Sequence, residues 1–186
     1  MKFKLMLICL FAGIVSNAAE PAFNNSGFED TLFNGIPAGW DGGRMIMDDG
    51  KSQSPNSVLD TEEFKEGKQS LKLELTPKIK TVILEAMTGS IVPGKAYEVS
   101  FWCRITGDCR VALRENHIMT DGKWNEKLLK NFIVEQGTTA WKKITGKVTA
   151  ADGDAKLGIT IFIDQGPGIV WLDGFDITEC SLTVKP

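Results

Sequence analysis

The sequence predicts an all-β protein, an antiparallel two-sheet β-sandwich of the jelly-roll type. Three observations favour this class: several short runs alternate apolar and polar residues, glycine and proline separate the runs, and no long amphipathic helix pattern occurs. A βαβ fold would need repeated helical crossovers, which the sequence does not supply. The one weak helical pattern spans residues 123–129, enough for a turn or two.

Two clearly alternating segments come first in the chain. Residues 70–75 (Ser-Leu-Lys-Leu-Glu-Leu) place three leucines on one face and a lysine and a glutamate on the other. In residues 97–105 the odd-numbered positions are Tyr, Val, Phe, Cys and Ile, which leaves Trp102 and Arg104 on the opposite face. Each segment is therefore expected to be a strand with one face in the core.

The later segments repeat this pattern. The segment from Arg110 to Arg114 alternates, and both of these arginines lie on the face away from Val and Leu. The segment that begins at Leu157 directs three isoleucines toward the core and leaves Phe162 and Asp164 on the other face. Gly-Asp, Asp-Gly and Gly-Pro-Gly sequences between the segments are typical of turns.

The first 18 residues are expected to be a signal peptide. Lys2 and Lys4 precede an apolar run of about 11 residues, shorter than the ~20 that a spanning helix needs. Ser16 and Ala18 place small residues at the −3 and −1 positions, so cleavage after Ala18 is predicted. The sequence thus predicts a secreted or periplasmic protein without a membrane span, whose single domain covers residues 20–186.

The net charge argues against nucleic acid as a partner. Removal of Lys2 and Lys4 leaves 19 basic against 24 acidic residues, a formal charge of about −5. An acidic chain is repelled by the phosphate backbone and by anionic lipid surfaces.

Three cysteines follow the predicted cleavage site, in a compartment that permits disulfides. Cys103 and Cys109 flank a turn-like Thr-Gly-Asp sequence and are candidates to pair, and Cys180 is the alternative partner for either. The chain has no C-x2-C pair and a single histidine, His117, which argues against a zinc site.

Catalytic residues are not evident. A glycosidase needs two carboxylates on either side of a sugar, but among 24 acids such pairs mean little, and Asp48-Asp49 and Glu62-Glu63 lie in polar, loop-like sequence. His117 is the sole imidazole, no Gly-x-Ser-x-Gly sequence accompanies it, and it is expected to be a surface or ligand-contact residue. The protein is therefore not expected to be an enzyme; a small hydrolase is a third-ranked hypothesis.

Six short phrases occur in order along the chain. Their order and spacing resemble those of carbohydrate-binding modules of the family 4/9/22 type, jelly-roll domains often appended to bacterial polysaccharide-degrading enzymes. Such modules usually bind glycans without cutting them. The phrases are residues 25–29 (Asn-Ser-Gly-Phe-Glu), 37–40 (Pro-Ala-Gly-Trp), 67–73 (Gly-Lys-Gln-Ser-Leu-Lys-Leu), 92–102 (Val-Pro-Gly-Lys-Ala-Tyr-Glu-Val-Ser-Phe-Trp), the run from Trp141, and 168–173 (Gly-Ile-Val-Trp-Leu-Asp).

The resemblance implies a structural calcium ion that ties the first strand to the last. Its carboxylate ligands would be Glu29 and Asp173, together with backbone carbonyls, the hard oxygen donors that calcium prefers. The closing phrase often reads Asp-Asp, whereas Gly174 follows Asp173 here. In the alternative interpretation both acids accept hydrogen bonds from loop amides.

The resemblance also indicates which tryptophans pack in the core and which are candidates to bind glycan. Trp40 and Trp141 occupy family positions that usually pack the sandwich, and Trp171 is expected to be half-buried. Trp102 is expected either to line the groove or to pack beneath an overlying loop. Trp124, in a Gly-, Asp- and Lys-rich stretch, is expected either to be exposed at the rim of the site or to cap the core.

Sugars rest their C–H faces on aromatic rings and direct their hydroxyls to polar side chains, so a glycan site needs exposed rings beside polar groups. In the family the groove is often the concave face of one sheet. The residues expected to bind glycan here are Trp102, Arg104, Arg110, Arg114, Asn116, Trp124, Phe162, Asp164 and Gln165.

The predicted function is therefore that of an exported, non-catalytic module that binds a poly- or oligosaccharide, with a separate glycoside hydrolase or an envelope component as a possible partner. Such modules usually accompany a catalytic domain, and none is evident in this sequence. The second hypothesis is thus an extracellular structural or adhesion β-sandwich that binds a protein or the cell envelope.

Overall fold

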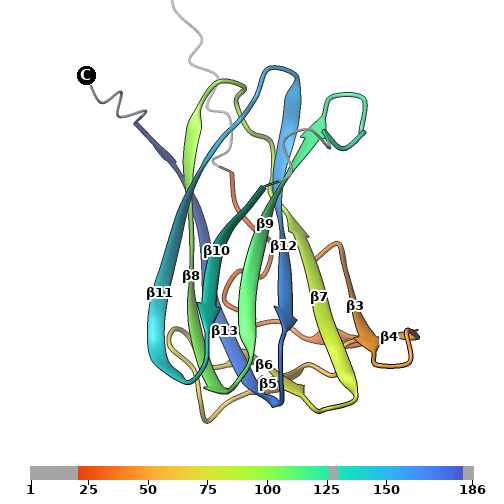
Figure 1. The fold of residues 1–186 in the computed structure, drawn as a ribbon. Coiled ribbons are helices and arrows are strands. Elements are labelled where there is room, and N and C mark those ends of the chain that lie inside the picture. Colours follow the sequence, from red (N-terminus) through yellow and green to blue (C-terminus); the bar gives the residue numbers. More distant parts are fainter. Residues whose placement is uncertain (1–20, 126–129, 182–186) are drawn as a thin grey trace, which may run out of the picture.

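The structure is a computed structural model that describes residues 21–125 and 130–181, so the predicted signal peptide lies outside the described residues. The predicted all-β fold is confirmed: the described residues form thirteen strands and no helix. Figure 1 shows two stacked sheets, with β10, β9, β12, β7 and β3 side by side in one layer and β11, β8 and β13 in the other. Within this part of the chain no helical segment has the length and hydropathy to cross a bilayer.

The larger sheet has six antiparallel strands, called sheet I here. Its strands, in spatial order, are β10 (Lys130–Gln136), β9 (Arg110–Met119), β12 (Asp154–Asp164), β7 (Ile79–Met87), β3 (Gly42–Met47) and β4 (Ser52–Gln53).

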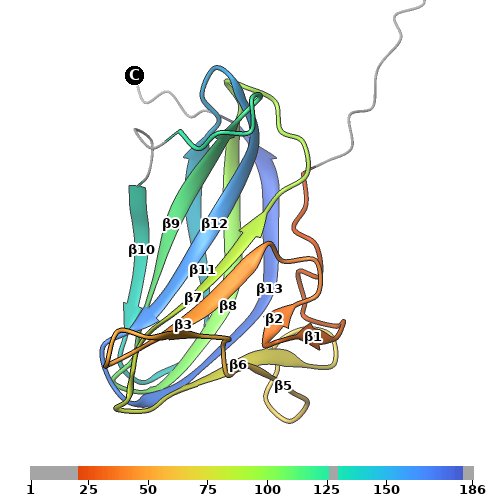
Figure 2. The same cartoon turned by 90° about the vertical axis from the view of Figure 1, so that its right-hand side faces the viewer.

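The other sheet has five antiparallel strands, called sheet II here. Its strands are β11 (Thr139–Thr149), β8 (Ala96–Gly107), β13 (Gly168–Cys180), β6 (Ser70–Leu75) and β5 (Val58–Asp60), and a small hairpin of β1 (Leu32–Phe33) and β2 (Ile36–Pro37) completes the fold. Figure 2 shows this hairpin beside β5 and β6.

The core lies between the two sheets and follows the predicted alternation. Leu71, Leu73 and Leu75 of β6 are 1% exposed or less, as are Ile161 and Ile163 of β12. Burial of such apolar surface is the main force that holds two sheets together, at roughly 25 cal/mol per Å². The strands predicted at residues 70–75, 97–105, 110–114 and 157–164 all occur, as β6, β8, β9 and β12.

An aromatic cluster fills one end of the core. The rings of Phe101 and Phe175 are stacked with centroids 4.8 Å apart, and Trp40 meets Phe175 edge-on at 5.3 Å. Phe28 lies 5.3 Å from Trp40 and 5.7 Å from Phe175. The prediction that Trp40 packs the core is therefore confirmed, since its side chain is 7% exposed.

The prediction that Trp141 packs in the core of the sandwich is wrong. The pairing of the edge strand β11 with β8 shifts between Thr139 and Lys142, so Trp141 falls in an irregularity, is only half-buried, and does not belong to the core cluster. Trp171, expected to be half-buried, is 6% exposed.

All three described cysteines are free thiols, so none of the three proposed disulfide pairings is present. Cys103 and Cys109 are fully buried, and burial raises the pKa of Cys103 to about 12 and that of Cys109 to about 11. The weak helical pattern at residues 123–129 lies partly outside the described residues; within it, Trp124 pairs with Ile118 as an extended bridge.

Candidate functional site: the outer face of sheet I

The outer face of sheet I gathers most of the residues predicted to bind glycan. Directly paired residues of antiparallel strands point to the same side, so the register arranges this face in rows across β9, β12 and β7. Along β9 the rows extend from Arg110 to Ile118, roughly 25 Å at about 3.3 Å per residue.

The middle row is apolar. Ile83, Phe162 and Ala112 lie side by side on β7, β12 and β9, and Arg44 of β3 continues the row. Ile83 and Ala112 are 5% and 8% exposed although they lie outside the core cluster, so neighbouring side chains cover them. The guanidinium carbon of Arg114 lies 5.2 Å from the centroid of the Phe162 ring, within cation–π range.

A polar row lies on one side of this apolar row. Arg114, Thr160 and Glu85 are paired across β9, β12 and β7. Asn116, in the next row, donates from Nδ2 to Thr160 Oγ1 at 2.7 Å, and Arg114 donates to Asn116 Oδ1 and to Thr160 Oγ1 at 3.3 Å each. Asn116 and Thr160 are completely buried, so this network is fixed rather than adaptable.

On the other side lies a paired charge. Arg110 donates from Nε and Nη2 to the two carboxylate oxygens of Asp164, at 2.8 and 2.7 Å, the bidentate geometry that guanidinium favours. The carboxylate of Asp164 raises the pKa of Arg110 through these hydrogen bonds. Gln165 follows Asp164 and accepts a hydrogen bond at 3.0 Å from Gln136 of β10.

A cavity of about 360 Å³ opens at this end of the face. Three of the predicted residues, Arg110, Asp164 and Gln165, line it, and it is open to solvent. The residues that line it are Thr76, Pro77, Ile79, Lys80, Thr81, Arg110, Asp164, Gln165 and Gly166.

Trp124 lies at the opposite end of the same face. Its bridge to Ile118, which is paired in turn with Lys156 of β12, places it on the side of Asn116 and Arg114. The side chain is 38% exposed, which matches the alternative of an exposed ring at the rim and not that of a cap on the core.

Trp102 and Arg104 lie elsewhere, on the outer face of sheet II. The expectation that they line one groove with the residues of β9 and β12 is wrong, because β8 belongs to the other sheet. Trp102 packs beneath a loop, the second of its two predicted alternatives: Nε1 donates to Glu66 at 2.6 Å and Lys65 Nζ lies 4.6 Å from the ring centroid. Arg104 pairs with Glu63.

The two acids predicted to bind calcium both accept hydrogen bonds from backbone amides. Asp173 is completely buried and accepts from the N–H groups of Lys65, Glu66 and Gly174, each at 2.8 Å. Glu29 accepts from the N–H of Lys68 at 2.8 Å. Both oxygens of Asp173 are thus engaged, so a calcium ion would have to share this carboxylate with amide donors.

No cluster of three or more His, Cys, Asp or Glu side chains within residues 21–125 and 130–181 is arranged to hold a metal ion. Calcium at Glu29 and Asp173 stays a prediction, because carbonyl ligands would not form such a cluster.

His117 is not at the surface, contrary to expectation. It is 2% exposed and contacts Asp154, which is 1% exposed. A substrate in solvent does not reach its imidazole. Asp48 and Asp49 are exposed, as the polar sequence around them predicted.

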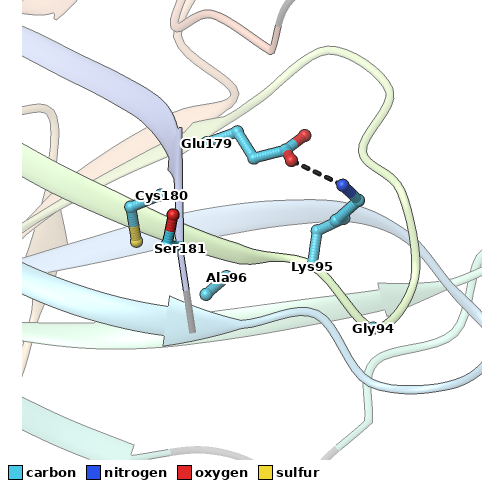
Figure 3. Close-up of a pocket in the computed structure, with 6 residues that line it drawn as sticks. All are labelled: Gly94, Lys95, Ala96, Glu179, Cys180 and Ser181. Carbon is cyan, nitrogen blue, oxygen red and sulfur yellow. Dashed lines mark hydrogen bonds and ion pairs between the residues drawn. The ribbon is translucent and has the colours of Figure 1, made fainter. Parts of the chain in front are cut away.

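A second cavity, of about 390 Å³, lies near the C-terminal end of β13 (Figure 3). Lys95 and Glu179 face each other across it at 2.6 Å, and Cys180 and Ser181 line the remainder. It has no aromatic side chain, so it lacks the ring on which a sugar would rest.

Sequence reasoning missed Ile83, Thr160, Glu85 and Arg44 of the outer face. The centre of β7, Val82 to Leu84, is apolar on both faces, so no alternation there identifies Ile83 as an outward residue.

Comparison with solved structures shows the fold. The structure is similar to a family 61 carbohydrate-binding module (TmCBM61) solved with β-1,4-galactotriose, at 16% identity and a TM-score of 0.54, over 84% of this chain and 96% of that one. It is also similar to the xylan-binding domain CBM22-1 of Paenibacillus barcinonensis Xyn10C, at 15% identity and a TM-score of 0.51, over 83% and 91%. A family 4 module matches at 15% identity and a TM-score of 0.54, over 84% and 99%.

A comparison with curated protein sequences found no match. The family model described as "Carbohydrate binding domain" matches residues 21–167. The two-sheet β-sandwich and the family match together define the class, a carbohydrate-binding module. The chain belongs to the carbohydrate-binding domain family of types 4 and 9, which confirms the resemblance found in its sequence.

Proposed function

We propose that this carbohydrate-binding module holds an oligosaccharide or a segment of polysaccharide along the outer face of sheet I, without cleaving it. The observation that carries the proposal is the half-buried ring of Phe162, which lies between two polar rows and beside the covered side chains of Ile83 and Ala112. Such a surface offers apolar contact to the C–H face of a sugar ring and hydrogen-bonding groups to its hydroxyls.

The rigidity of the face supports binding. Phe162, Arg114 and Asn116 are fixed by neighbouring strands and by a buried hydrogen-bond network, so few side chains lose freedom when the ligand binds. Trp124 at one end and the cavity around Arg110 and Asp164 at the other would define the length of the bound segment.

The chain acts outside the cytoplasm in this proposal, as a non-catalytic unit that brings a glycan to an enzyme or to the cell envelope. Support comes from the basic and apolar N-terminal sequence, which matches a signal peptide. Galactotriose and xylan are ligands named for structural relatives, and the particular sugar of this chain is left to experiment.

A glycan array, followed by titration of each hit, tests the function. Phe162→Ala and Trp124→Ala are expected to weaken binding, by an amount near 1–3 kcal/mol for the loss of a stacked ring. Trp102→Ala is the matched control, because it removes a tryptophan from the outer face of sheet II. The reverse pattern would move the site to sheet II, and no glycan binding at all would favour a protein-contact role.

A further inference from the structure

We propose that the glycan bound by sheet I is anionic, and that Arg114 binds its carboxylate or sulfate group. The inference rests on the proposed function and specifies the ligand of the same site. It follows from how the charges on this face are paired.

Arg114 is a half-buried cation in the centre of the face. Its guanidinium makes two long hydrogen bonds, 3.3 Å each, to the neutral oxygens of Asn116 and Thr160, and lies over the ring of Phe162. No carboxylate of the described residues forms an ion pair with it. A partly desolvated charge with only neutral partners is less stable than one that meets an opposite charge.

Neither of the two nearby carboxylates on the same face, Asp164 and Glu85, is directed at Arg114. Both oxygens of Asp164 accept from Arg110, so this pair is internally neutral. Glu85 is paired with Thr160 across the sheet, but its Oε2 lies 3.4 Å from where a Cβ on Gly42 would stand. It is therefore directed toward β3, whereas Arg114 lies on β9, on the far side of β12.

Arg110 and Arg114 differ in the groups that accept hydrogen bonds from their guanidinium. Arg110 has the bidentate carboxylate that a guanidinium fork prefers, and Arg114 has none. A uronic acid carboxylate offers the same planar pair of oxygens, and two of the terminal oxygens of a tetrahedral sulfate ester can also accept from the guanidinium fork. The sugar ring that carries the anion would lie beside the Arg114 guanidinium, which itself covers the ring of Phe162.

Pairs of polymers that differ only in their anionic groups separate the effect of ligand charge on affinity from that of ligand shape. Polygalacturonate and alginate are compared with their carboxyl-reduced forms, and a sulfated galactan with its desulfated form. In each pair the backbone is retained and only the anion is lost. The purified protein is expected to bind one acidic member about 10- to 100-fold more tightly than its neutral counterpart, the effect of a hydrogen bond to a charged group.

Two substitutions assign the preference to Arg114. Arg114→Gln retains donors and removes the charge, and is expected to reduce the preference for the acidic polymer to about threefold or less. Arg114→Lys is expected to retain part of it, because the charge stays and the fork is lost. Lys147→Gln makes the same charge change on exposed β11 of sheet II and is expected to leave the preference unchanged.

The outcomes are distinct. Preference for a uronate identifies a carboxylate ligand, and preference for the sulfated polymer identifies a sulfate. Equal binding of the acidic and neutral members overturns this inference but leaves the proposed function standing. A preference for the acidic polymer that Arg114→Gln does not alter has the same consequence. Failure of every polymer and of the glycan array to bind overturns both.

Discussion

His117 Nδ1 lies 2.6 Å from Asp154 Oδ2, and neither side chain is more than 2% exposed. The same carboxylate oxygen accepts the N–H of Ala151 at 2.7 Å, whereas Oδ1 of Asp154 is buried without a hydrogen-bond partner among the residues that the structure describes. Asp154 therefore depends on His117 and on one amide for its stabilisation in the protein interior.

Removal of His117 is expected to destabilise the fold strongly. His117→Leu leaves Asp154 buried without its imidazole partner, a change that costs about 3–5 kcal/mol of unfolding free energy in buried pairs. Urea unfolding measures the loss. The double variant His117→Leu/Asp154→Leu is expected to lose less than the sum of the two single variants. A loss below about 1 kcal/mol for His117→Leu would show that the pair does not hold the structure together.

Trp40 and Trp141 are expected to differ in stability effect. Trp40→Ala removes a ring that contacts Phe28 and Phe175 in the core and should cost about 3–5 kcal/mol. Trp141→Ala should cost clearly less, because its side chain is half-buried on the edge strand β11. Melting curves of both variants give the order. The opposite order would place Trp141 among the core residues, as its sequence position suggests.

Stability is expected to fall between about pH 4 and pH 2 because of Asp60. Burial raises the pKa of this carboxyl, but hydrogen bonds from Trp171, the amides of Glu62 and Glu63, and Lys72 outweigh burial and lower the pKa from 3.8 to about 2. A depressed folded-state pKa stabilises the protein above the unfolded value and ceases to do so as pH falls through the folded value.

Asp60→Asn is the test of this window. The variant cannot titrate at this position, so its urea midpoint should change less between pH 5 and pH 2.5 than that of the parent. Asp49→Asn serves as a control: its pKa is also lowered, through hydrogen bonds from Lys51, but Asp49 is exposed and far less is expected from it. Equal acid sensitivity of Asp60→Asn and the parent would contradict the prediction.

Calcium is expected to raise the melting temperature if Glu29 and Asp173 bind it, because a ligand of the folded state stabilises by mass action, by about 2.7 kcal/mol at 100 times the dissociation constant. Thermal scans with calcium, with magnesium and with chelator measure this, and Glu29→Gln should abolish any shift. The same melting temperature in all three buffers would leave both carboxylates solely as acceptors for the loop amides.

The sequence could predict which residues of a strand point away from the core, but not to which sheet the strand belongs. Alternation places Trp102 of β8 and Arg114 of β9 equally well on an outer face. The two strands are consecutive, yet they belong to different sheets, so the residues lie on opposite sides of the sandwich. Six of the predicted residues, on β9, on β12 and in the turn after β12, are brought together, and Trp124 joins their face through its bridge to Ile118.

Other differences have local physical causes. A shift in strand pairing next to Trp141 breaks the alternation there. His117 has the inward parity of Val111 and Leu113, and only its polarity suggested a surface position, since a buried partner such as Asp154 is not visible in the sequence. Ile83 of β7 was missed because it lies in the run from Val82 to Leu84, which is apolar on both faces of the strand.

The buried thiols of Cys103 and Cys109 allow separation of the two sheets to be measured by thiol labelling. The thiolate is the form that reacts with alkylating agents, and Cys103 and Cys109 hold few thiolates at neutral pH while the fold is intact. Cys180 is partly accessible and can be labelled directly. The labelling rate of Cys103 relative to that of Cys180 therefore measures how often the two sheets separate.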